Sequence, residues 1–143
     1  MLCLVQYWGN ASAPSWSRGT GSGPWVMVDL EAGVWAGSHT PVSSTNTPII
    51  ADYVTAMAKG KPGQMALKGG DANSGVLKCM YEGPRPDGYN PMKKQGAIIL
   101  GIGGDNSDAA VGSFFEGVIT KGYSTDAADD AVQANIMGVG YGK

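Results

Sequence analysis

Short apolar runs separated by turn-forming residues are the dominant pattern along this chain. Val, Ile, Leu, Met and aromatic residues gather in runs of five to ten residues, at positions 2–8, 24–31, 64–68, 75–81, 96–102 and 111–120. The segments between them are rich in Gly, Pro, Ser and Asn, which favour turns. This spacing predicts an all-β, antiparallel sandwich. Residues 49–59 fit either a strand or a short helix.

The last part of the chain has a different period. In "STDAADDAVQANIMG", Ala128, Val132 and Ile136 recur every four residues. Thr125 precedes them as an N-cap, aspartates follow it in the first turn, and Gly138 stands where a C-terminal cap belongs. We therefore expect a short helix laid on the sandwich, with its aspartates interacting with the helix dipole rather than acting as catalysts.

Composition limits the classes of function. The chain has 143 residues, enough for one domain with a modest core, and we expect residues 1–143 to form a single domain. Charged residues make up 15%, the net charge is −2, and the lysines are scattered. Nucleic-acid binders need a basic face, which this pattern lacks. A neutral, polar substrate suits the balance better.

Metal and triad chemistry have few candidate residues. Cys3 and Cys79 are far apart, and the one histidine, His39, lies in the turn-like "GSHTP", where solvent exposure is expected. We predict neither a zinc centre nor any other metal or cofactor. Whether the two cysteines pair or stay free is open. The first residues are too short and too aromatic a run for a signal peptide, and no later segment has the length of a membrane span.

Two acidic segments are candidates for chemistry. In the strand "GPWVMVDLE", alternation puts Val26, Val28 and Leu30 on a core face, and Trp25, Met27, Asp29 and Glu31 on the other. Neighbouring carboxylates beside an indole suit a sugar site, although the pattern by itself favours a solvent-facing strand that happens to hold two acids. In "GIGGDNSD", Asp105 follows glycines after an apolar run. That carboxylate either opens a turn or partners Glu31 across a glycosidic bond.

A family resemblance favours the second interpretation. The segments "GPWVMVDLE" and "RPDGYNPMKKQGAIILGIGGDNSDAAVGSFFEGVITKGY" resemble the catalytic domain of the family 54 α-L-arabinofuranosidases, from about Tyr7 to Gly138. That likeness implies a concanavalin-like (jelly-roll) sandwich and a retaining glycosidase that removes terminal L-arabinofuranose from arabinan or arabinoxylan in hemicellulose degradation. By the same likeness Glu31 is the nucleophile and Asp105 the general acid/base. Trp16, Asp29 and Gly104 would line the sugar subsite.

The chain departs from the family pattern in several ways. Ala32 stands where the family has an asparagine that contacts the sugar. The part of the catalytic domain that precedes this region in the family, with its adjacent cysteine pair, is absent, as are the arabinan-binding module and a secretion signal. We therefore expect the second half of a secreted enzyme's catalytic domain. An incomplete sandwich leaves strand edges uncovered, which predicts self-association.

Two other functions stay open. The segment "FFEGVITKGYSTDAADDAV" also resembles the closing strand and helix of concanavalin-like domains that bind carbohydrate without cutting it. An inactive truncated remnant would neither bind nor hydrolyse sugar. Glu116 is another acid in this segment, and we interpret it as structural.

Overall fold

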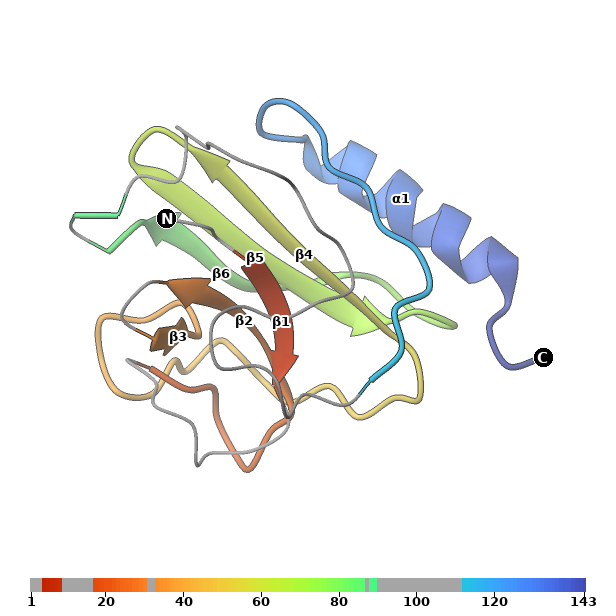
Figure 1. The fold of residues 1–143 in the computed structure, drawn as a ribbon, viewed down its shortest axis with the longest axis horizontal. Helices are drawn as coiled ribbons and strands as arrows, with labels where there is room; N and C mark the ends of the chain where they lie inside the picture. Colours follow the sequence, from red (N-terminus) through yellow and green to blue (C-terminus); the bar gives the residue numbers. More distant parts are fainter. Residues whose placement is uncertain (1–3, 9–16, 31–32, 87, 90–111) are drawn as a thin grey trace.

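Two antiparallel three-stranded sheets and one helix make up the described part of the chain. The structure is a computed structural model, and it describes residues 4–8, 17–30, 33–86, 88–89 and 112–143. The first sheet has the order β1 (Leu4–Trp8), β2 (Trp25–Leu30), β3 (Gly33–Trp35). The second has the order β4 (Val54–Lys61), β5 (Gln64–Asp71), β6 (Lys78–Pro84). The helix α1 (Asp126–Val139) follows near the C-terminus (Figure 1).

The two sheets pack face to face, which confirms the predicted antiparallel sandwich. Val26, Val28 and Leu30 of β2 form one core cluster with Met65 and Leu67 of β5. Period-2 alternation puts these side chains on the inner face of each sheet. Gly69 lies where the layers come closest, because a Cβ there would stand 2.6 Å from Val26 Cγ2 and 2.7 Å from Ile49 Cδ1.

The helix covers the outer face of the second sheet, beside β4 (Figure 1). Gln133 donates to the Asp71 carbonyl at 2.7 Å, and Lys59 and Lys68 contact Asp129. With the first sheet on one side and α1 on the other, β5 is buried at every position from Met65 to Gly70. No helix among the described residues is long and apolar enough to cross a membrane.

Most predicted strands are confirmed, with shifted ends. The runs at 2–8, 24–31, 64–68 and 75–81 correspond to β1, β2, β5 and β6, and the ambiguous run 49–59 contains the start of a strand, β4. The short strand β3 was not predicted, because three residues that begin with a glycine carry almost no periodic signal. The run 96–102 lies outside the described residues.

The expected strand at 111–120 is wrong in this structure. Residues 112–120 are exposed throughout and form no strand. A strand needs a neighbour for its backbone groups, and within the described part of the chain no other segment pairs with this one.

The C-terminal helix is confirmed, with its cap displaced. Thr125 is the N-cap, and its hydroxyl accepts from the Ala128 N–H at 3.2 Å. The C-cap is Gly140, at φ 70°, so Gly138 lies inside the helix. The helix residues that are fully buried are Asp129 and Gln133, rather than members of the apolar row. The helix is therefore held to the sandwich through polar contacts.

Candidate functional site

Asp29 is the predicted site residue that the structure describes. It lies near the end of β2, with Leu4 and Val34 as its Cα partners on either side. Both β2 neighbours of Asp29 are buried, whereas Asp29 is half-exposed. A carboxylate in the middle strand of a sheet is costly to bury, and the partial exposure of Asp29 reduces that cost.

The other predicted site residues, Trp16, Glu31, Gly104 and Asp105, lie outside the described residues, as does Ala32. The chain on either side of Glu31 is fixed, because Leu30 and Gly33 are directly paired in β2 and β3. Ser17, which follows Trp16, is buried, and its hydroxyl accepts from the Ala36 N–H at 3.0 Å. Gly33 and Ala36 are three residues apart, about 10 Å along an extended chain. Ser17, which is next to Trp16, and Gly33, which is close to Glu31, therefore both lie at the β3 region of the first sheet.

The expected aromatic platform beside Asp29 is wrong for Trp25 and Met27. Trp25 is 1% exposed, and its indole Nε1 donates to the Thr20 carbonyl at 2.7 Å. With Met27, Val34 and Ala36 it forms a second core cluster. Both faces of β2 are therefore covered. The continuous apolar run "WVMV" is the sequence signal for this, because strands buried on both faces read as unbroken hydrophobic runs.

A buried ionic cluster under α1 escaped the sequence analysis. Asp129 accepts from Lys59 at 2.6 Å and lies 2.7 Å from the Lys68 ammonium, while Asp126 accepts from Lys68 at 2.6 Å and from Lys59 at 3.3 Å. Ser124 also donates to Asp129, at 2.5 Å. The sequence signal was a lysine that directly follows a short apolar run in each of two strands, "AMAK" and "MALK".

In this cluster the lysines and the aspartates each stabilise the charged form of the other against the effect of burial. Burial of Asp129 opposes its ionisation, but the hydrogen bonds from Lys59, Lys68 and Ser124 outweigh burial and lower the pKa of Asp129 to about 2. Burial also works to lower the pKa of Lys68, and its hydrogen bonds to Asp126 and Asp129 raise that pKa above the usual value. Groups locked as ions are unsuited to proton transfer near neutral pH, so the cluster is structural.

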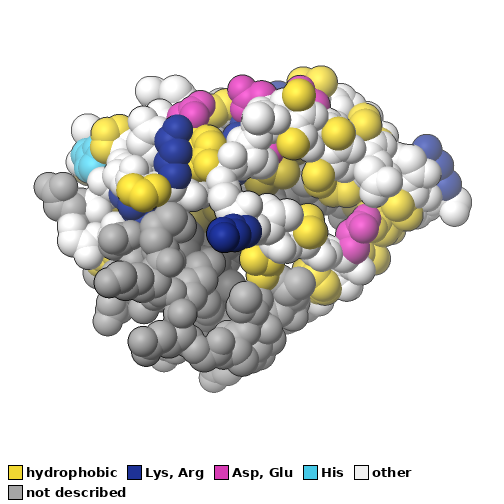
Figure 2. All heavy atoms as spheres, turned by 90° about the horizontal axis from the view of Figure 1, so that it is seen from above, with side chains coloured by type: hydrophobic (Ala, Val, Ile, Leu, Met, Phe, Trp, Pro, Cys, Tyr) yellow, Lys and Arg dark blue, Asp and Glu magenta, His cyan; other side chains and the backbone are white. Residues whose placement is uncertain are grey.

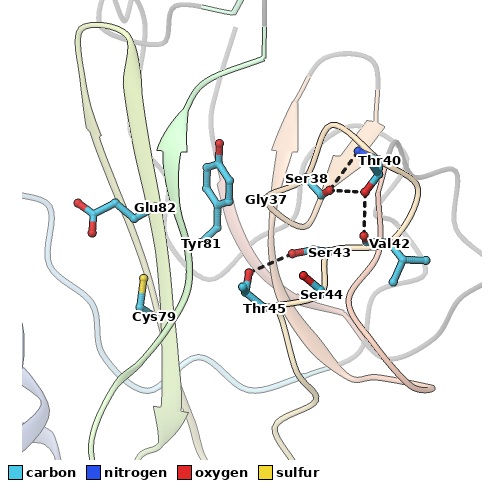
Figure 3. Close-up of a pocket in the computed structure, with 10 residues that line it drawn as sticks. All are labelled: Gly37, Ser38, Thr40, Val42, Ser43, Ser44, Thr45, Cys79, Tyr81 and Glu82. Atoms are coloured by element: carbon cyan, nitrogen blue, oxygen red, sulfur yellow. Dashed lines mark hydrogen bonds between the residues drawn. The ribbon is translucent and has the colours of Figure 1, made fainter.

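A polar recess lies between the loop after β3 and strand β6 (Figure 3). Its volume is about 410 Å³, and its walls carry mainly hydroxyl groups, from Ser38, Thr40, Ser43, Ser44, Thr45 and Tyr81. Most of these groups already bond within the protein: Ser38 to Thr40, and Thr45 to the Met80 carbonyl at 2.6 Å. None of the predicted site residues lines the recess. Nor do the described residues contain a cluster of His, Cys, Asp or Glu that could hold a metal ion.

His39 and Cys79 were considered in the sequence analysis as possible triad and thiol residues. His39 is exposed, as predicted, and its ring lies 6.2 Å from that of Trp35. Cys79 is a free, exposed thiol. Cys3 lies outside the described residues.

Comparison with known proteins identifies the family. Residues 5–142 match the family model described as "Alpha-L-arabinofuranosidase B, catalytic". The chain belongs to this family.

Similar fungal relatives support the assignment. The chain is 52% identical over 128 residues to a probable α-L-arabinofuranosidase B of Aspergillus terreus, a match that covers 88% of this chain. It is 51% identical over 137 residues to an α-L-arabinofuranosidase of Hypocrea jecorina, covering 94% of this chain. In both comparisons the chain spans about a quarter of the relative's length, 25% and 27%.

Solved family 54 structures share the fold. A variant arabinofuranosidase soaked with 4-nitrophenyl α-L-arabinofuranoside matches with a TM-score of 0.79 and 44% identity, covering 94% of this chain and 27% of that one. An arabinofuranosidase complexed with arabinofuranosyl-α-1,2-xylobiose matches with a TM-score of 0.77 and 48% identity, over 85% of this chain and 26% of that one. These family members agree with the β-sandwich predicted from the sequence.

Proposed function

We propose that this chain provides the reacting carboxylates of a retaining α-L-arabinofuranosidase, as part of a single catalytic β-sandwich. The observation that carries the proposal is the match of residues 5–142 to the family's catalytic unit. The similarity to structures that hold arabinofuranosides supports the same substrate class. The substrate is then a terminal L-arabinofuranose on an arabinan or arabinoxylan side chain.

The mechanism assigns one role to each carboxyl group. The Glu31 carboxylate attacks the anomeric carbon while Asp105 donates a proton to the leaving glycosidic oxygen, so that the C–O bond breaks and a glycosyl–Glu31 ester forms. Asp105 then takes a proton from water, whose oxygen displaces Glu31 and releases arabinose with retained configuration. Trp16, Asp29 and Gly104 position the furanose ring. Ala32 offers no side-chain hydrogen bond, so one interaction that would strengthen toward the transition state is missing.

The test is hydrolysis of 4-nitrophenyl α-L-arabinofuranoside by the full chain beside Glu31→Gln and Asp105→Asn. We expect Glu31→Gln to remove detectable turnover and Asp105→Asn to lower kcat by about 10²–10⁴-fold. Asp130→Asn is the matched control, because Asp130 is an exposed acid on α1 and should leave turnover unchanged. Equal turnover in all four proteins would contradict the assignment.

A non-catalytic carbohydrate-binding domain is the alternative function. It predicts that the unmodified, folded chain binds arabinose-containing oligosaccharides in calorimetry without hydrolysing them. An inactive remnant predicts neither binding nor turnover. Retained binding with lost turnover in Glu31→Gln separates the enzyme from both.

We also propose an extracellular location and self-association for this chain. Arabinan and arabinoxylan are polymers that do not cross membranes, so an enzyme acting on their side chains works outside the cell. The proposal of self-association rests on the outer strands β1, β3, β4 and β6, each of which pairs on one side only within the described part of the chain.

A further inference from the structure

The polar recess between the loop after β3 and strand β6 offers mainly hydrogen-bond acceptors. The Thr40 hydroxyl donates to the Val42 carbonyl at 2.9 Å, and the Thr45 hydroxyl donates to the Met80 carbonyl at 2.6 Å. A hydroxyl group has one proton and a carbonyl oxygen only accepts, so both threonine oxygens can only accept from any further partner. In the 2.7 Å contact between Ser38 and Thr40, Ser38 is therefore the donor (Figure 3).

Other groups of the wall have the same character. The Tyr81 hydroxyl donates to the Pro84 carbonyl at 2.5 Å, so its proton is engaged as well. Ser38 accepts from the Thr40 N–H at 3.0 Å, which leaves the second lone pair of its oxygen for another donor. No lysine, arginine or histidine is among the described residues that line the recess. A ligand bound here must therefore supply most of the hydrogen-bond donors.

The charges around the recess favour a neutral ligand. An anion needs donors or cations, and on the described part of the face in Figure 2 the lysine and arginine side chains stand apart from one another. Glu82 is among the lining residues, but its side chain points away from the loop in Figure 3 and accepts from Tyr123 at 2.8 Å. The described residues also contain no cluster of His, Cys, Asp or Glu for a metal ion.

A sugar unit meets these requirements. Each free hydroxyl group of a sugar carries a proton, and several such groups on one ring can donate to neighbouring acceptor oxygens. The recess has a volume of about 410 Å³, within the range of pockets that hold small ligands. Its mainly hydroxyl-lined wall offers little apolar surface to a hydrophobic ligand.

We propose that this recess binds one sugar unit of a glycan, whose hydroxyl groups donate to the oxygens of Ser38, Thr40 and Thr45. The choice of a pentose glycan rests on the proposed function, whereas the binding itself uses neither of the predicted catalytic carboxyl groups. The recess begins at Gly37, four residues after Gly33 and thus at most about 14 Å from it along the chain. Gly33 follows the predicted nucleophile by two residues, so the recess is a second subsite for the same glycan.

The first test is a titration of the full, nitrogen-15-labelled chain with xylotriose, followed through the amide chemical shifts. Xylotriose contains no arabinofuranose, so hydrolysis does not interfere. We expect saturable shifts in residues 37–45 and no comparable shifts in α1. Thr40→Val removes one acceptor oxygen and should weaken binding about three- to tenfold. Thr120→Val is the matched control, because it makes the same change at an exposed threonine outside the recess, and it should leave binding unchanged.

Two results of this titration would overturn the proposal. One is the absence of saturable shifts in residues 37–45. The other is equal affinity of the unmodified chain and Thr40→Val for xylotriose.

A second test asks whether the ligand supplies the donors. Per-O-methylated xylotriose keeps the sugar rings but has no hydroxyl protons, so it should not bind. Equal binding of the methylated compound, or shifts in residues 37–45 that saturate with calcium chloride or sodium phosphate but not with xylotriose, would contradict a sugar site.

Turnover of 4-nitrophenyl α-L-arabinofuranoside, measured on the same preparation, separates this proposal from the proposed function. An active chain without xylotriose-induced shifts in residues 37–45 overturns the sugar site alone. An inactive chain that shows these shifts supports the sugar site and contradicts the proposed catalytic function.

Discussion

Lys59, Lys68 and Asp129 show how single residues fix the position of a whole element. All three are buried, and an unpaired buried charge costs several kcal/mol. They are satisfied only when α1 is seated on the sheet, because the lysines belong to β4 and β5 and the carboxylate belongs to the helix. The cluster therefore sets the place of α1 more strictly than an apolar contact would.

The lowered pKa of Asp129 predicts acid sensitivity. A carboxyl group with a folded-state pKa of about 2 and an ordinary value of 3.8 contributes stability that is fully present above about pH 4 and is lost as the pH falls toward 2. We expect this loss to be about 2 kcal/mol. Denaturant unfolding between pH 5 and pH 2 measures it. Asp129→Asn should lower the free energy of unfolding at pH 7 by about 3 kcal/mol and flatten the acid decline, while Asp130→Asn should preserve that decline.

At the scale of the element, α1 begins and ends by local signals. Thr125 supplies the N-cap hydroxyl, Asp126 and Asp129 lie in the first turn, and Gly140 adopts the left-handed conformation that ends the helix. In the sequence alone, Gly138 and Gly140 are equally good candidates for the glycine that ends the helix. The backbone conformation, at φ 70° for Gly140, distinguishes the cap from a glycine that continues the helix.

Removing the N-cap should destabilise this element in a graded way. Thr125→Ala deletes the acceptor for the Ala128 N–H and should lower the free energy of unfolding by about 1 kcal/mol. Thr125→Ser keeps a hydroxyl at the same position and serves as the control, with little change expected. Helix content by circular dichroism and urea unfolding report both variants. A Thr125→Ser variant as unstable as Thr125→Ala would show that the methyl group, not the cap, carries the effect.

At the scale of the whole molecule, the distance between the sheets depends on one small residue. Gly69 approaches Val26 and Ile49 so closely that an added methyl group requires one layer to move. Since interiors pack at high density, the displaced side chains have little free space to enter.

Gly69→Ala should therefore lower the free energy of unfolding by about 1–3 kcal/mol. Gly138→Ala provides the contrast, because that glycine lies inside α1 with open space around its Cβ position, and alanine there should raise stability by up to about 1 kcal/mol. Thermal unfolding of the two variants gives the comparison. If both changes had the same sign, the close approach of the sheets at Gly69 would not be what limits residue size there.

The sequence by itself located the strands and the helix that are specified by residues close together in the chain. Alternation and turn formers located β1, β2, β5 and β6 to within a few residues, and the capping threonine located α1. The family motif predicts Glu31, Asp105, Trp16, Asp29 and Gly104 as site residues, and those roles stay predictions. Asp29, the one that the structure describes, is partly exposed near the end of a buried strand. These features depend on neighbours in the chain, which a single sequence displays.

The tertiary structure alone decided which faces are covered. Trp25 has the pattern of a platform residue but lies in the core, because the chain around Thr20 covers its face of β2. Lys59 and Lys68 come from two different strands, and α1 brings Asp129 into contact with both of them. The run 112–120 has the pattern of a strand and remains exposed, because a strand also requires a neighbour. Burial, ion pairing and strand pairing join residues distant in sequence, and one-dimensional periodicity carries no record of which segments meet.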